Sequence, residues 1–163
     1  FMNGALSVKP DIKFKVTFIG SWYDPPKAKE AAIAQVEAGV DVMYAERAGV
    51  VDACREKGII AFGNVNDMNK EEDGTDVVVT SALWHMESAI DHAIERTKSG
   101  TFSAEEYHSW TMMAKGGATL APYYEFDSKV PEAVKARVEA LSKEIIAGKF
   151  VVEINDNEPK STF

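Results

Sequence analysis

The chain has 163 residues, which is long enough for one domain with a hydrophobic core, and it has no internal disulfide because Cys54 is its only cysteine. A hydrophobic content of 45% and a charged content of 27% are ordinary for a folded protein. The formal net charge of -8 argues against a polyanionic partner, since neutralising phosphates requires a basic face. No apolar run approaches the ~20 residues of a membrane span.

The first residues, FMNGALSVKPD, are typical of the end of a helix that runs into Pro10, with no cap before it. They have neither the basic start nor the long apolar stretch of a signal peptide. We therefore expect this chain to have been cut from something longer.

The segment 12–24, IKFKVTFIGSWYD, predicts a strand, a tight turn and the start of a helix. Polar and apolar residues alternate over 13–18, which is typical of a strand. Asp24 directly before two prolines predicts a helix N-cap. Trp22 and Tyr23 then lie on a strand-to-helix turn, where ligands bind in open α/β sheets.

Helices and strands alternate along the next part of the chain. Helical spacing and closing glycines predict helices at 27–38, 50–57 and 86–97. Short, apolar, β-rich runs predict buried strands at 40–45, 59–62 and 76–81, and the polar run 69–75 predicts a surface loop. This alternation indicates βαβ units, and thus an α/β fold with a parallel sheet flanked by helices.

The pattern changes after residue 100. Two extended segments, 107–114 and 118–124, flank a Lys-Gly-Gly turn and predict a hairpin. Pro131 starts a further amphipathic helix, and a last short strand is expected at 149–154. Residues 155–163 form a polar tail by composition.

The carboxyl ends of parallel strands lie at one edge of a sheet, so we expect the residues that follow the strands to meet there. These residues are aromatic, amide and carboxylate side chains, a set that suits a flat, hydrogen-bonding ligand. Each also has an ordinary structural interpretation as a core lid, a turn residue or a surface pair. The candidate ligand-binding residues are Trp22, Tyr23, Glu46, Asn64, Asn66, Asp67 and Trp84.

Motifs for catalysis, metal binding or a cofactor are missing from the sequence. His85, His92 and His108 lack ligand spacing with acidic or cysteine neighbours, so no metal site is expected. The Walker spacing, the dinucleotide fingerprint and the nucleophile elbow are all absent. An enzyme with Glu46 and Asp67 as acid and base would lack a nucleophile, so we expect no catalytic residues and no cofactor.

Four runs in order, FIGSWYDPPKAKEAA, GVDVMYAE, IIAFGNVND and VVVTSALWHM, resemble the basic membrane protein (BMP) family of substrate-binding lipoproteins. These proteins serve ABC importers and include purine nucleoside receptors. The resemblance runs from Asn3 to the last predicted strand. It implies a type I periplasmic-binding-protein topology, with two α/β lobes around a ligand cleft. Residues 1–154 would be the C-terminal lobe with the segments that cross back, and the N-terminal lobe would be absent.

By this resemblance, Trp22 is the aromatic residue that stacks on the base. Trp84 stands where nucleoside receptors tend to carry a lysine that helps to hold the sugar, which implies a free nucleobase such as adenine. The turn 63–67 (GNVND) departs from the acidic G-V-D-type turn of the family. The helix that holds Ile90 and Ile94 would pack against the first lobe.

The sequence thus favours a solute-binding component of an ABC importer that captures a purine-like ligand between two lobes. The ABC permease would be its partner, and it would be a periplasmic or cell-surface lipoprotein, held to the membrane by a lipid anchor outside this chain. The alternative is a ligand-sensing effector domain of a regulator or signalling receptor, because the same fold serves those roles.

Overall fold

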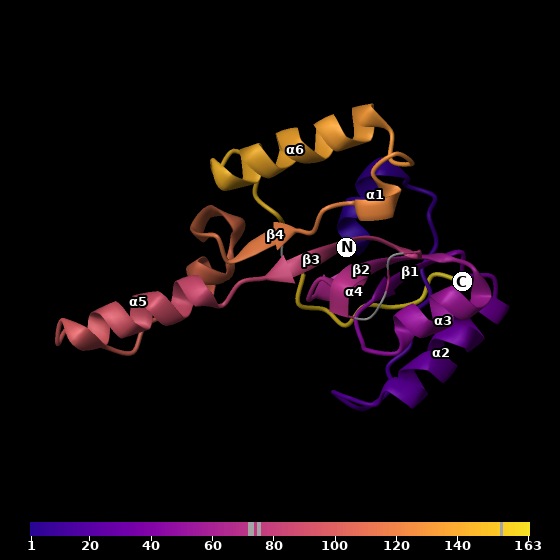
Figure 1. Ribbon diagram of the computed structural model, residues 1–163, viewed down its shortest axis with the longest axis horizontal. Coiled ribbons are helices and arrows are strands. Elements are labelled where there is room, and N and C mark those ends of the chain that lie inside the picture. Colours follow the sequence, from indigo (N-terminus) through magenta and orange to yellow (C-terminus); the bar gives the residue numbers. More distant parts are fainter. Residues whose placement is uncertain (72–73, 75, 154) are drawn as a thin grey trace.

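The computed structural model (Figure 1) describes residues 1–71, 74, 76–153 and 155–163. Within these residues the strands form a four-stranded sheet in the order β1-β2-β3-β4. Their bounds are β1 (Val42–Ala45), β2 (Ile60–Val65), β3 (Val78–Trp84) and β4 (Ala118–Leu120). β1, β2 and β3 are parallel, and β4 is antiparallel to β3. The expected α/β fold is confirmed, with an antiparallel strand at one edge of the sheet.

Helices precede, connect and follow the strands. The α-helices are α1 (Met2–Val8), α2 (Pro25–Glu37), α3 (Val50–Lys57), α4 (Met68–Glu71), α5 (Glu87–Lys98) and α6 (Glu132–Ile146), and the 3-10 helices are η1 (His108–Thr111), η2 (Met113–Lys115) and η3 (Tyr124–Phe126). The predicted cap of α2 is confirmed, because Asp24 Oδ1 accepts a hydrogen bond from the Lys27 N–H at 3.2 Å and Pro25 takes the first helical position. No helix of the described residues is long and apolar enough to cross a membrane.

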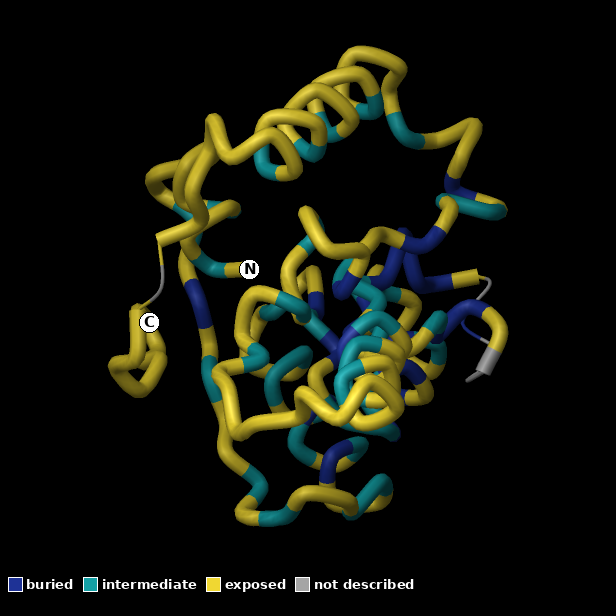
Figure 2. The backbone as a smooth tube through the Cα atoms, turned by 90° about the vertical axis from the view of Figure 1, so that its left-hand side faces the viewer, coloured by how far each residue is buried: buried dark blue, intermediate teal, exposed yellow. Residues whose placement is uncertain are grey.

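The hydrophobic core lies on one face of the sheet, where α3 and α4 pack against the parallel strands and α2 packs on α3. Its members are small and medium apolar side chains, namely Ala32, Met43, Ala45, Val51, Ala53, Cys54, Ala61, Met68, Val77 and Val78. The inner segments of the tube in Figure 2 are the most deeply buried. Cys54 is fully buried there, as expected for a small core residue.

The opposite face of the sheet is covered only in part. The ring of Phe1, at the start of α1, stacks on Tyr44 with 4.8 Å between centroids and lies 5.7 Å from Phe62. Val42 and Ile60 on the same two strands each remain 37% exposed. Parallel sheets are normally covered on both faces, so this face offers apolar area to a further layer.

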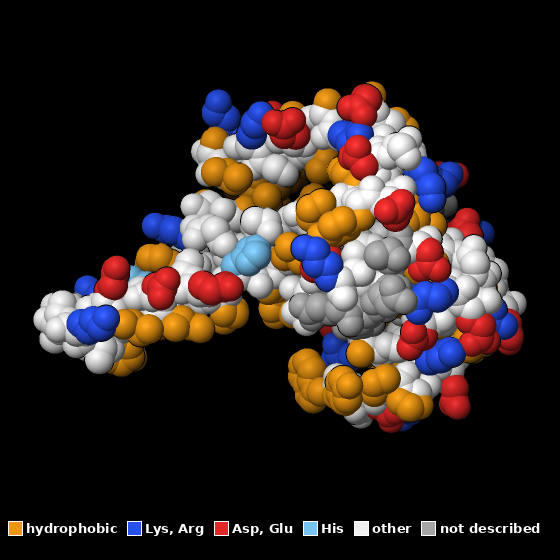
Figure 3. Space-filling view, in the orientation of Figure 1, with side chains coloured by type: hydrophobic (Ala, Val, Ile, Leu, Met, Phe, Trp, Pro, Cys, Tyr) orange, Lys and Arg blue, Asp and Glu red, His pale blue; other side chains and the backbone are white. Residues whose placement is uncertain are grey.

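The second half of the chain packs more loosely. In Figure 1, α5 projects from the body and α6 lies above the sheet. The row of hydrophobic side chains along α5 is visible in Figure 3, and Ile90 and Ile94 are 54% and 43% exposed. No residue of α6 is buried, in agreement with the exposed helix at the top of Figure 2.

Residues 12–19 do not form the predicted strand. The Thr162 N–H donates to the Phe14 carbonyl, the Phe14 N–H donates to Thr162 Oγ1, both at 2.7 Å, and the Val16 N–H donates to Ser161 Oγ at 2.9 Å. The C-terminal tail therefore satisfies these backbone groups, partly through hydroxyl groups. These hydrogen bonds do not form the regular pattern of a β-sheet, so residues 12–19 lie outside the sheet. Within the sheet, β1 pairs with β2.

Three further sequence predictions are wrong in detail. Residues 107–114 form short 3-10 turns, because local bonds such as the Gly117 N–H to Met112 carbonyl replace a hairpin and β4 pairs with β3. The run 69–75 is no simple surface loop, since Asn69 is buried and its amide donates to the Val78 carbonyl at 3.1 Å. Residues 149–153 form no strand, and Ile154 lies outside the described residues, as do 72, 73 and 75 of the expected loop.

Candidate functional site

The carboxyl ends of β1, β2 and β3 lie at the same edge of the sheet. Ala45, the last residue of β1, lies beside Gly63, and Gly63 lies beside Ser81, so β2 continues two residues and β3 three residues beyond the end of β1. Neighbouring strands are about 4.8 Å apart, so β1 and β3 are separated by about 10 Å across the sheet. This carboxyl edge is where the sequence predicts the ligand site.

The turn that carries Trp22 lies against the exit of β1. Arg47, just after β1, donates from Nε to the Ser21 carbonyl at 3.4 Å, and its guanidinium lies 5.0 Å from the Trp22 ring. The start of α2 approaches the same exit closely: a Cβ on Gly49 would lie 2.2 Å from the carbonyl oxygen of Pro25. The predicted proximity of the first turn to the β1 exit is therefore present in the structure.

Trp22 and Tyr23 are the most exposed of the aromatic candidates. Their exposed fractions are 88% and 78%. The Trp22 ring is open to solvent. Its apolar surface is removed from water only when a partner stacks on it. Glu46 is also exposed, and its carboxylate forms an ion pair with Arg47 Nη1.

Asn64 is buried on the less covered face of the sheet. The Tyr44 hydroxyl donates to Asn64 Oδ1 at 2.9 Å. Burial raises the pKa of the Tyr44 phenol and the nearby Glu46 carboxylate raises it further, so Tyr44 stays protonated as a donor. Tyr44 thus fixes the orientation of the Asn64 amide. The sequence pattern did not indicate Tyr44 as the partner of Asn64.

A strained turn follows Asn64. Val65 has a φ of +70°, and the Asn66 N–H donates to the Asn64 carbonyl at 2.8 Å, which closes a three-residue turn. A β-branched residue with positive φ is rare, and such strain is concentrated at functional sites. The turn leaves the side chain of Asn66 exposed at the edge.

Asp67 is bound to another part of the chain. The Tyr124 hydroxyl in η3 donates to Asp67 Oδ2 at 2.5 Å, and Lys70 Nζ lies 3.8 Å from the same oxygen. Oδ1 of Asp67 is buried and has no hydrogen-bond partner among the described residues. One carboxylate oxygen therefore holds η3, and the other is left without a donor.

Trp84 ends β3 and is 60% exposed. Asn64 lies beside Ala82 across β2 and β3, and Trp84 follows two residues later. Side chains two apart on a strand share a face, so Trp84 and Asn64 are on the same face of the sheet.

The seven candidates therefore fall into three groups along the carboxyl edge. Trp22, Tyr23 and Glu46 adjoin the β1 exit. Asn64 and Trp84 share a sheet face, and Asn66 belongs to the turn that follows Asn64. Asp67 is tied to Tyr124. No ring contact joins Trp22 to Trp84 among the residues that the structure describes. The structure thus gathers the candidates at one edge without enclosing them in one pocket.

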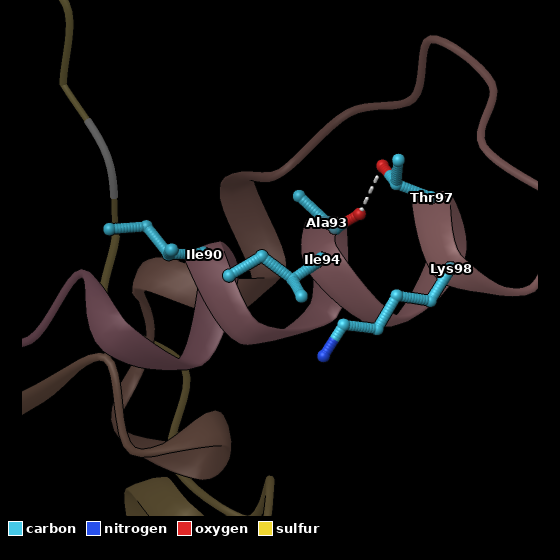
Figure 4. Close-up of a pocket in the computed structure, with 5 residues that line it drawn as sticks. All are labelled: Ile90, Ala93, Ile94, Thr97 and Lys98. Atoms are coloured by element: carbon cyan, nitrogen blue, oxygen red, sulfur yellow. Dashed lines mark hydrogen bonds between the residues drawn. The ribbon is translucent and has the colours of Figure 1, made fainter.

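Two hollows in the surface have no candidate residue in their lining. One runs along α5 and is lined by Ile90, Ala93, Ile94, Thr97 and Lys98, which follow one side of the helix in Figure 4. The other lies between β4 and α6. Within the described part of the chain, no three His, Cys, Asp or Glu side chains are grouped as a metal site would require.

Comparisons with known proteins identify relatives over nearly the whole chain. The chain is 30% identical over 155 residues to a purine-binding protein of Brucella abortus, covering 92% of this chain and 41% of that protein. It is 30% identical over 145 residues to a putative ABC transporter glucose-binding protein, TsgA13, of Haloferax volcanii, covering 88% and 35%. It is 26% identical over 171 residues to the ABC transporter nucleoside-binding protein BmpA of Lactococcus lactis, covering 93% and 47%. The chain spans less than half the length of these relatives.

Solved structures share the fold. An ABC transporter solute-binding protein of Aeropyrum pernix superposes with a TM-score of 0.68 at 16% identity, over 94% of this chain and 51% of that one. A transcriptional activator of the comK gene from Bacillus halodurans gives 0.63 at 26% identity, over 83% and 47%. The family of PnrA-like ABC transporter substrate-binding proteins matches residues 1–157. The chain therefore belongs to this family, as the resemblance in the sequence implied.

Proposed function

We propose that this chain is the C-terminal lobe, with its crossing segments, of a solute-binding protein that delivers a purine nucleobase to an ABC importer. The observation that carries the proposal is Trp22, an 88% exposed indole at the carboxyl edge of the sheet. The purine-binding and nucleoside-binding names of two relatives support the ligand class.

Binding would rest on stacking and on polar recognition of the edge of the base. A base stacked on an aromatic side chain gains roughly 1–3 kcal/mol, and Trp22 and Trp84 are the indoles exposed at this edge. The Tyr44 hydroxyl already donates to the amide oxygen of Asn64, so the amide nitrogen of Asn64 is the group left to donate to a ligand. Tyr23, Glu46, Asn66 and Asp67 complete the proposed set.

Capture requires a second surface above the edge. The chain covers 35–47% of the three relatives, which supports a further lobe of similar size in the complete protein. Closure of two lobes would bury the base, and the ligand would shift the balance toward the closed form by its preference for that form. No bond chemistry is involved. The permease would be the partner, and the complete protein would act in the periplasm or at the cell surface as a lipoprotein.

Calorimetric titration of the complete protein with adenine, guanine, adenosine, uracil and glucose tests the proposal. We expect adenine or guanine to bind more tightly than uracil or glucose. Trp22→Ala should raise the dissociation constant roughly five- to 150-fold, which corresponds to the loss of one stacking contact. The control is Trp110→Ala, because the Trp110 ring is covered by His92 and Lys115 of the same chain.

Two results would oppose the proposal. Tight binding of glucose alone would favour the sugar specificity named for the Haloferax relative. Equal effects of the Trp22 and Trp110 substitutions would remove Trp22 from the site.

The alternative function is ligand sensing within a regulator. It is favoured by the 26% identity and shared fold with the Bacillus transcriptional activator, and by 25% identity over 145 residues to a metabotropic glutamate receptor-like protein of Dictyostelium discoideum. The gene sequence upstream of Phe1 distinguishes the two functions. A helix-turn-helix segment there supports the regulator, and a lipoprotein signal supports the importer.

A further inference from the structure

Arg47 covers one face of the indole that the proposed site uses. The guanidinium carbon lies 5.0 Å from the centre of the Trp22 ring, within the range of a cation–π contact. A planar guanidinium also stacks well on an aromatic face. Arg47 therefore contacts one face of the Trp22 ring, while the residue as a whole remains 88% exposed.

The position of Arg47 is also fixed by groups other than the Trp22 ring. Its Nε donates to the Ser21 carbonyl at 3.4 Å, its Nη1 donates to the Glu46 carbonyl at 3.2 Å, and Nη1 also pairs with the Glu46 carboxylate. The side chain of Arg47 is only 27% exposed. A polar side chain held by three groups can act as a fixed surface for a mobile ring.

We propose that Arg47 is a positioning residue of the ligand site, which holds the Trp22 indole from behind so that its free face is presented to a planar ligand. The inference rests on the proposed function for the identity of the ligand as a purine base. Ordering an exposed tryptophan before binding lowers the entropy cost that the ligand would otherwise bear. Arg47 thus contributes to affinity through Trp22, without touching the ligand.

The sequence alone does not predict that Trp22 and Arg47 are in contact. Trp22 and Arg47 are 25 positions apart, at the ends of two different turns. They meet because the turn before α2 and the exit of β1 lie at the same edge, where Gly49 lets the start of α2 approach. The Glu46–Arg47 neighbours therefore do more than form a surface ion pair.

Fluorine NMR of the ligand-free protein, labelled with fluorotryptophan, tests the contact itself. The Trp22 resonance is assigned by its loss in Trp22→Phe. We expect Arg47→Met to narrow this resonance and move it toward its position in the unfolded chain, and Arg47→Lys to give a smaller change, since lysine keeps the charge but loses the planar group. The control Arg137→Met removes the same charge from α6 and should leave the resonance unchanged. Equal spectra for the Arg47 and Arg137 variants would overturn the inference.

Adenine titration then tests the link to binding. Arg47→Met should raise the dissociation constant of adenine roughly three- to tenfold, and it should have no further effect in a Trp22→Ala background. An equal loss in both backgrounds would show that Arg47 acts without Trp22 and would overturn the inference. If the unmodified protein binds neither adenine nor guanine, the proposed function fails, whereas the NMR result still decides whether Arg47 holds the Trp22 ring.

Discussion

Residues 25–84 and residues 85–146 differ in how far they bury their apolar side chains. In the first region, Ala45, Val51, Ala61 and Val78 have no exposed surface, because α3 and α4 pack on one face of the sheet and α2 packs on α3. In the second region, α6 has no buried residue and α5 buries only Ala89. The first region therefore stabilises itself, and the second presents apolar helix faces to whatever lies beside it.

The contrast has a physical consequence for stability. Each square ångström of apolar surface removed from water contributes roughly 25 cal/mol, so the first region should dominate the free energy of unfolding. Exposed apolar stripes such as that of α5 contribute only when a further surface covers them. Substitutions of one residue type in the two regions measure this difference directly.

The largest expected effect comes from a matched pair of methionines. Met43→Ala, at a site that is 4% exposed, should lower the free energy of unfolding by about 2–5 kcal/mol, through lost burial and the cavity that remains. Met86→Ala, at a site that is 50% exposed, should change it by less than about 1 kcal/mol. Urea unfolding followed by circular dichroism measures both. Equal losses would mean that the two regions are equally packed, contrary to the comparison.

The second effect concerns a side-chain hydrogen bond between the two regions. Tyr124→Phe removes the hydroxyl that donates to Asp67 and should cost about 1.5–3 kcal/mol, because the half-buried carboxylate then loses its hydrogen bond at Oδ2. The control is Tyr123→Phe, because the Tyr123 hydroxyl forms no hydrogen bond with the described residues. Hydrogen exchange should also show faster exchange around η3 in the Tyr124 variant. An unchanged exchange pattern would mean that other contacts hold the second region in place.

The smallest effect uses the pKa of Cys54 to report on the first region alone. Burial raises the pKa of this thiol from 9.0 to about 11. The unfolded chain loses the thiol proton near pH 9 and the folded chain only near pH 11, so stability is full below pH 9 and falls as the pH rises toward 11. At pH 10 the loss is about 1.4 kcal/mol.

Cys54→Ala provides the reference for this measurement, because the other titrating groups are common to both proteins. The stability difference between the two should shrink by that amount between pH 8 and pH 10. A constant difference over this range would show that solvent reaches the thiol in the folded protein.

The local pattern of residues predicts most of the secondary structure and the edge at which the candidates gather. Asp24 before two prolines starts α2, Gly58 closes α3, and β-rich runs give the parallel strands. Parallel strands separated by helices place their carboxyl ends together for topological reasons, so the edge needs no knowledge of side-chain contacts. The prediction failed at 12–19, where an alternating pattern cannot say whether a neighbouring strand is available.

Partners distant in the chain decide the state of each polar group at that edge. Arg47 bonds to Ser21 across 26 positions, Asp67 to Tyr124 across 57, and Phe14 to Thr162 across 148. Such contacts depend on how whole helices and strands pack, so residue type and spacing do not predict them. Folding therefore determines that Asp67 holds η3, that Asn64 is oriented by Tyr44, and that Trp22 remains open on the face turned away from Arg47.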